Sequence, residues 1–253
     1  MSAPDRDRIG GFEWTTRTRG RLTRRERLGL LGAIVNSQRD YFLHRLRGAR
    51  PSTSPRPGER EIRPPDSRFA REAEAAAAEQ NPVILTHSYR SWIFGRALAD
   101  VDGIAVDDEL LYAGCLLHDH GIEPVVAGED FTLRSARRAT DCAQSAELDN
   151  VRTAELADGI TVHTTPGISV ERDGALGYYI QYGAMVDIVG NRVWDLSEDL
   201  VDDTLARYDR RGFTRGLASH FTAEAKAVPG GRFSMLRRCG FVQLMYLAPF
   251  DQK

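Results

Sequence analysis

The pair His118-Asp119 stands at the end of an apolar segment, LLYAGCLLHDHG. Two adjacent side chains cannot share one face of a helix, but at a helix end the chain turns and both can point toward one centre. An imidazole beside a carboxylate suits Zn, Fe, Mn or Co. The pair therefore predicts a metal site. The alternative is an ordinary helix end, with a cationic histidine near the negative pole of the helix dipole.

Two further residues could complete this site. Asp187 lies among apolar residues in YYIQYGAMVDIVG, where a buried carboxylate must be ion-paired, hydrogen-bonded or metal-bound. An arginine partner is the alternative, and it would count against the metal site as a whole. His87 follows four apolar residues in NPVILTHSYRSWIFG, where the alternative is a core histidine with no ligand role. Taken together, the sequence predicts one divalent cation between His87, His118, Asp119 and Asp187.

Two other residues are candidates for catalysis and substrate binding. His163 ends the segment AELADGITVH, just before TTPG, and we expect it to relay protons or contact substrate. The alternative for His163 is a core position or an interaction with a helix dipole. Arg90 is one helical turn beyond His87, so the two share a face. We expect Arg90 to bind substrate or to orient Asp119, with a surface salt bridge as the alternative.

The order and setting of these residues resemble the HD superfamily, helical metal-dependent enzymes named for their histidine-aspartate pair. A single histidine, then a His-Asp pair further along the chain, then a distant aspartate match the ligand pattern of that superfamily. The resemblance implies that His87, His118, Asp119 and Asp187 are the metal ligands, and that residues 67–253 form a helical HD-type catalytic domain.

A narrower resemblance is also visible. Several strings are similar to the cyanamide hydratase branch, whose members add water across a carbon-nitrogen triple bond, giving urea, at a single metal. The strings, which cover residues 65 to about 190, are PDSRFAREA, THSYRSWIFG, ELLYAGCLLHDHG, ITVHTTPG and YGAMVDIVG. The resemblance implies hydration or hydrolysis of a small molecule. The chain before Pro65 lies outside it, and the last third of the chain matches only loosely.

The expected function is therefore that of a metal-dependent hydratase or hydrolase. Two imidazoles and two carboxylates leave a divalent cation, with Zn or Fe favoured over Mn or Co, one or two open positions. The cation lowers the pKa of bound water toward about 7. We expect the resulting hydroxide, held beside Asp119, to attack an electrophilic carbon of a cyanamide- or nitrile-like molecule while His163 relays protons.

Three alternatives remain open. An HD phosphohydrolase acting on a nucleotide or other phosphate ester would need cationic groups around the metal. A dinuclear-iron oxygenase would need two further histidines between the pair and the last aspartate, where this chain has only His163 and the adjacent His120. The third alternative is a non-catalytic sensor or partner-binding module.

The segments that must position these residues all have helical character, so the expected fold class is all-α. Within the extension formed by residues 1–66, the part before Arg24 lacks periodicity and should be loosely ordered. Through Arg50 the chain carries 12 arginines against 5 acids. Residues 24–47 predict an amphipathic helix whose apolar face needs a partner, either the main domain or a second subunit in a homodimer. Its apolar residues are Leu28, Leu31, Val35, Phe42 and Leu46. A proline-rich linker follows, which places a domain boundary near residue 66.

Composition bounds the remaining possibilities. With 42% hydrophobic residues, 253 residues can bury a substantial core. A net charge of -2 gives no reason to expect nucleic-acid binding by the whole chain. No apolar run is long enough to cross a bilayer, and MSAPDRDRIGG lacks the apolar region of a secretory signal. We therefore expect a cytoplasmic enzyme with a small-molecule substrate and no membrane partner.

Overall fold

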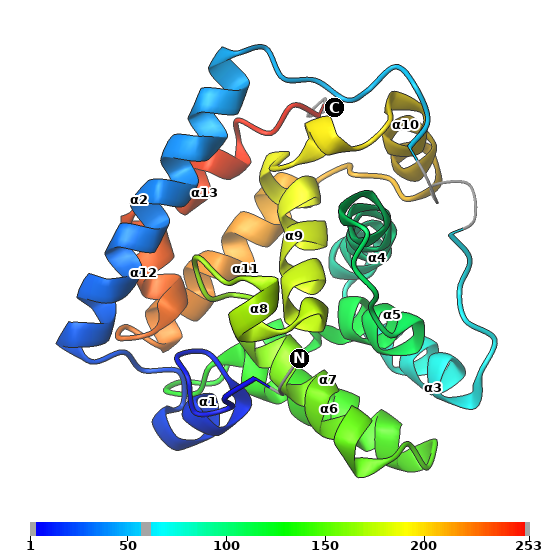
Figure 1. Ribbon diagram of the computed structural model, residues 1–253. Helices are drawn as coiled ribbons and strands as arrows, with labels where there is room; N and C mark the ends of the chain where they lie inside the picture. Colours follow the sequence, from blue (N-terminus) through cyan, green and yellow to red (C-terminus); the bar gives the residue numbers. More distant parts are fainter. Residues whose placement is uncertain (1–3, 57–61, 251–253) are drawn as a thin grey trace.

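The computed structural model describes residues 4–56 and 62–250, and within these ranges the chain is all-helical with no β-strand (Figure 1). This confirms the expected all-α fold class. The α-helices of the described residues are α1 (Phe12–Thr18), α2 (Arg24–Leu46), α3 (Arg68–Ala77), α4 (Pro82–Asp102), α5 (Asp108–Leu117), α6 (Phe131–Ser145), α7 (Asn150–Val162), α8 (Val170–Asp173), α9 (Ala175–Val189), α10 (Glu198–Arg207), α11 (Phe213–Ala227), α12 (Arg232–Arg238) and α13 (Phe241–Met245). Two short 3₁₀ turns, η2 (His120–Ile122) and η3 (Val193–Asp195), complete the order.

Helices α4 and α9 lie side by side at the centre of the fold (Figure 1). Glycines at their contact allow the two backbones to approach closely: a Cβ atom on Gly183 would lie 2.1 Å from the Ser91 carbonyl oxygen. A Cβ atom on Gly95 would similarly lie 2.6 Å from the Tyr179 carbonyl oxygen. Since α4 carries His87 and α9 carries Asp187, this contact brings residues 100 positions apart into one site.

The short helix α5 delivers the His-Asp pair to the same place. Asp107 caps its first turn by accepting a hydrogen bond from the Leu110 amide, and every apolar residue of the helix is buried. The helix ends at Leu117 with His118 as its C-cap, and Asp119 leaves the helical conformation with φ −106°. Helix α7 similarly ends at Val162 with His163 as its C-cap. Both histidines therefore stand at helix ends, as the sequence predicts.

The expectation that the segment before Arg24 is loosely ordered is wrong for its described part. Helix α1 buries Trp14, whose indole Nε1 donates a 2.8 Å hydrogen bond to Glu26. Arg8 forms ion pairs with Asp158 at 2.9 Å and Asp173 at 2.8 Å. The contacts of Arg8 are long-range, so a short segment without hydrophobic periodicity gains its order from residues distant in sequence.

Helix α2 covers the range expected for the amphipathic helix, but it buries a different face. A capping box starts it, in which Thr23 and Glu26 each bond the other's backbone amide. The buried residues are Leu30, Ile34 and Tyr41. The expected apolar stripe is exposed instead, at Leu28, Leu31, Val35, Phe42 and Leu46. The main domain therefore covers one face of α2 and leaves the other open.

Residues 57–61 of the predicted linker lie outside the described residues. The preceding part contacts the start of α10, because the Ser52 amide donates to the Leu196 carbonyl and the Glu198 amide donates to the Ser52 carbonyl. Ser67 then caps α3 by accepting from the Ala70 amide. Across the parts of the chain that are described, no helix combines the length and the apolar character that a bilayer crossing requires.

Candidate metal centre

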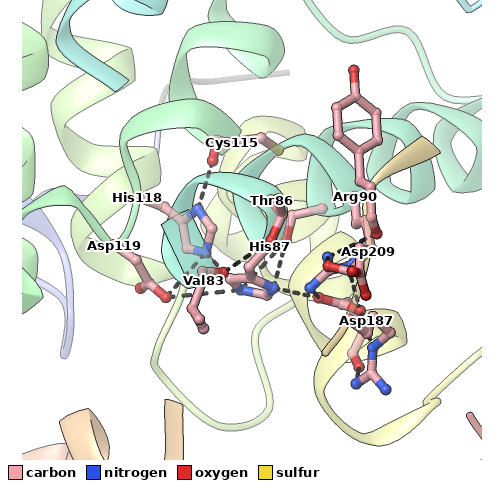
Figure 2. Close-up of polar contacts among 12 residues, drawn as sticks. Val83, Thr86, His87, Arg90, Cys115, His118, Asp119, Asp187 and Asp209 are labelled. Carbon is pink, nitrogen blue, oxygen red and sulfur yellow. Dashed lines mark hydrogen bonds and ion pairs between the residues drawn. The ribbon is translucent and has the colours of Figure 1, made fainter. Parts of the chain in front are cut away.

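Three buried side chains, His87, His118 and Asp119, bring potential metal ligands together (Figure 2). The Nε2 atoms of the two histidines are 3.3 Å apart. Asp119 Oδ2 lies 3.8 Å from His87 Nε2 and 3.5 Å from His118 Nε2. Each of these residues is at most 2% exposed, so water competes weakly for the ligand atoms.

In each imidazole, a hydrogen bond made by Nδ1 leaves Nε2 facing the centre of the group. His87 Nδ1 donates to the Asp187 carboxylate at 2.6 Å, and His118 Nδ1 donates to the Cys115 carbonyl at 2.7 Å. A carbonyl oxygen can only accept, so the proton of neutral His118 is on Nδ1 and its Nε2 lone pair faces the centre. An ionised Asp187 fixes His87 in the same tautomer. Metal-binding histidines characteristically have such outer hydrogen bonds.

The charge states also suit metal binding. Burial lowers the pKa of His118 to about 3, so its imidazole is neutral near pH 7, as a metal ligand must be. Burial alone would raise the pKa of Asp119, but the neighbouring imidazoles of His118 and His163 outweigh it and hold that pKa below its ordinary value. Asp119 is therefore an ionised carboxylate. Its buried Oδ1 has no hydrogen-bond partner, which is rare for a carboxylate oxygen.

The spacing of the three ligand atoms fits a small divalent cation. Three atoms with separations of 3.3, 3.5 and 3.8 Å lie on a circle with a radius of about 2 Å, which matches Zn–N and Zn–O bond lengths of about 2.0–2.2 Å. Two imidazoles and one carboxylate form a ligand set known from catalytic zinc sites, where a further position stays open for water or substrate. The residues present therefore fit the predicted cation with three protein ligands.

Asp187 lies outside this group of three. Its carboxylate accepts the His87 hydrogen bond and forms ion pairs with Arg90 and Arg210, each at 2.8 Å. Burial alone would raise the pKa of Asp187, but the two guanidinium charges outweigh it and hold that pKa well below its ordinary value. The arginine partner considered as the alternative for Asp187 is therefore present, in duplicate. Direct binding of a cation by Asp187 would require it to give up these contacts.

Arg90 is buried rather than at the surface. Its Nε donates to Asp187 at 2.9 Å, and one terminal nitrogen donates to the carbonyls of Tyr208 and Asp209. These contacts show that Arg90 holds Asp187 in place. A salt bridge was the alternative considered for Arg90, and it is present, but in the core and not at the surface. Arg210, which sequence reasoning missed, donates to the Asp187 carboxylate and to its backbone carbonyl. The segment YDRRGF that contains Arg210 shows no pattern that marks one arginine as buried.

His163 faces the opposite oxygen of the Asp119 carboxylate. Its Nε2 lies 3.7 Å from Asp119 Oδ1, and its Nδ1 donates to the Ile160 carbonyl at 2.6 Å. The His163 and His118 rings meet edge to face with centroids 5.0 Å apart. His120, although adjacent to the pair, instead contacts Glu79 at 3.3 Å. The structure thus brings His163, but not His120, to the three candidate ligands.

A cavity of about 100 Å³ opens beside His118, Asp119 and His163. Its walls are mainly apolar and aromatic and come from helices α2, α9, α11, α12 and α13. They include Tyr41, Met185, Phe221, Phe233, Phe241 and Leu244. No arginine or lysine is among the described residues that line it. The contribution of α2, through Ile34, Ser37, Gln38 and Tyr41, was not anticipated from the sequence, because these residues do not form its apolar stripe.

No protein-family model matches this chain, and no curated protein matches it.

Proposed function

We propose that this protein is a metal-dependent hydratase or hydrolase of the HD type, acting on a small neutral molecule such as a cyanamide or nitrile. The observation that carries the proposal is the buried group of His87, His118 and Asp119 beside an apolar cavity. The two arginine partners of Asp187 count against the expected site of four ligands. The proposal therefore rests on three protein ligands, which suffice for a catalytic site. In this arrangement Asp187 orients His87, and Arg90 and Arg210 hold Asp187 in place.

A divalent cation, with Zn or Fe preferred and Mn or Co acceptable to the same ligands, would supply Lewis acidity and lower the pKa of a water bound to it. The protein's own residues would orient the substrate and transfer the protons. The apolar walls orient the substrate and exclude bulk water. His163 Nε2 accepts a proton from the attacking water and returns it to the substrate nitrogen, while its Nδ1 stays bonded to the Ile160 carbonyl.

The lining of the cavity favours this function over phosphate-ester hydrolysis. Recognition of a phosphate normally uses arginine or lysine, and none is found on the described walls. Arg90 and Arg210 are occupied by Asp187 and by backbone carbonyls. A neutral substrate needs no such cation.

The test combines elemental analysis of protein purified without chelators with an assay for urea release from cyanamide and for hydration of small nitriles. Wild type should contain about one divalent transition metal per chain and turn over at least one of these compounds. Asp119→Ala should lose both metal and turnover. His120→Ala is the matched control, since it alters the neighbouring residue, and it should retain both.

His163→Gln separates the proton relay from metal binding. The variant should retain the metal, and its turnover should fall by about 10²- to 10⁴-fold. Full activity in metal-free Asp119→Ala would refute the proposal. Phosphate release from nucleotides would favour the phosphohydrolase, two irons per chain the dinuclear oxygenase, and metal-free wild type without activity a sensor.

A further inference from the structure

Two residues that line the cavity each have a buried polar atom without a hydrogen-bond partner. Among the described residues, five buried side-chain oxygen or nitrogen atoms have no hydrogen-bond partner. Two of the five residues concerned, Asp119 with its Oδ1 and Thr164 with its Oγ1, line the cavity beside the candidate metal centre. Thr164 is 7% exposed. Since a buried polar group without a partner destabilises a fold, two such groups at one cavity point to a ligand that satisfies them.

The turn that carries Thr164 is held firmly by its neighbours. Gln181 of α9 donates to the carbonyls of both His163 and Thr165, on either side of Thr164. Arg232 donates to Thr165 Oγ1 at 2.8 Å and to the Thr161 carbonyl at 2.7 Å. The hydroxyl of the adjacent Thr165 thus has a partner, and the Thr164 hydroxyl does not. A rigid turn with one free hydroxyl is preorganised for binding.

We infer that Thr164 is a substrate-binding residue that recognises the polar head of the substrate. A carboxylate that binds a cation accepts hydrogen bonds and donates none, so Asp119 Oδ1 can only accept, whereas the Thr164 hydroxyl can both donate and accept. The complementary ligand is neutral, has an N–H group and a hydrogen-bond acceptor, and carries a small apolar substituent that packs against the aromatic walls. A primary amide or an N-cyano compound meets these requirements. This inference deepens the proposed function, because it assigns the substrate class of the same site.

Replacement by valine tests the inference, because valine keeps the shape of threonine and removes only the hydroxyl. Zinc-loaded protein is titrated with isobutyramide by calorimetry or ligand-observed NMR. Thr164→Val should bind isobutyramide on the order of tenfold more weakly than wild type, and Thr164→Ser should bind close to wild type. Methyl isobutyrate, which lacks the N–H group, and the isobutyrate anion should bind wild type more weakly than the amide.

A stability measurement separates binding from a structural role. Removing an unpaired hydroxyl loses no hydrogen bond, so the thermal midpoint of ligand-free Thr164→Val should equal or exceed that of wild type. Thr161→Val is the matched control: the Thr161 hydroxyl donates to the Asp158 carbonyl, so this variant should be less stable but bind the amide normally. Unchanged amide affinity in Thr164→Val, or a loss of stability like that of Thr161→Val, would overturn the inference. If the protein binds the amide but turns over neither cyanamide nor small nitriles, the result would count against the proposed function alone.

Discussion

The Nε2 atoms of His87 and His118 are 3.3 Å apart, and neither donates a hydrogen bond to the other when both imidazoles are neutral. Two lone pairs facing one another in a buried site repel, and a cation between them removes the repulsion. We therefore expect metal removal by a chelator to lower the thermal midpoint of wild type, and added Zn²⁺ to restore it. In Asp119→Ala, neither treatment should move the midpoint. An unchanged wild-type midpoint after verified metal removal would contradict this prediction.

Asp187→Asn should weaken metal binding without abolishing it. Asparagine can still accept a hydrogen bond from His87 but carries no charge, so metal affinity should fall by about 10- to 100-fold. Because Arg90 and Arg210 stay buried without their counter-ion, the free energy of unfolding should fall by about 3–5 kcal/mol. Competition with a chromogenic chelator measures the affinity, and denaturant unfolding measures the stability.

Asp130→Asn is the matched control for Asp187→Asn. Asp130 is also buried and forms a 3.0 Å ion pair with an arginine, Arg232, away from His87. Its replacement should reduce stability but leave the metal affinity unchanged. Complete loss of metal from folded Asp187→Asn would instead make Asp187 a direct ligand.

Glu224 should make stability depend on pH. Burial, reinforced by the charge of Asp130, raises the pKa of Glu224 to about 7, although Arg134 opposes the shift. The folded state therefore binds the proton more tightly than the unfolded state. The resulting stabilisation is fully present below about pH 4.5 and is lost as pH rises through about 7. Its full size is about 3 kcal/mol.

Replacing Glu224 by glutamine isolates this effect. Measured by urea unfolding, the free energy of unfolding of Glu224→Gln minus that of wild type should become more positive from pH 5 to pH 8. A difference that stays constant over this range would show that Glu224 titrates alike in the folded and unfolded states.

The exposed stripe of α2 predicts a homodimer, which is one of the two partners that the sequence leaves open for this face. Leu28 is 73% exposed and Val35 is 55% exposed on one helix face, an arrangement typical of interaction surfaces. Light scattering after size-exclusion chromatography should give a dimer for wild type and a monomer for Val35→Lys. Val151→Lys introduces the same change at an exposed valine of α7 and should remain dimeric. A monomeric wild type would show that the stripe does not join two copies.

The sequence was most informative where local pattern determines structure. His118 and His163 end apolar helical segments, so their positions at helix ends follow from periodicity and termination signals near them. The burial of Asp187 likewise follows from its apolar neighbours. These features are local, and the structure shows each of them.

The partners of these residues depend on distant parts of the chain. Arg210 reaches Asp187 from 23 residues away, and only the packing of the chain after α10 determines which of its arginines is buried. The order of α1 rests on Arg8, which contacts Asp158 from 150 residues away. The face of α2 that is buried was misjudged because the most apolar stripe faces outward. Periodicity predicts a helix but does not identify the partner of each face.

Helix α2 contributes part of the cavity wall but none of the three candidate ligands. Substitutions of its inward residues would therefore alter the cavity without disturbing His87, His118 and Asp119. Removing residues 1–66 would open the cavity to solvent rather than simply delete an accessory arm. The α2 part of the cavity wall and the candidate ligands thus lie in separate parts of the chain, so redesign of this one helix would reshape the cavity while Thr164 and the other helices keep the rest of the wall.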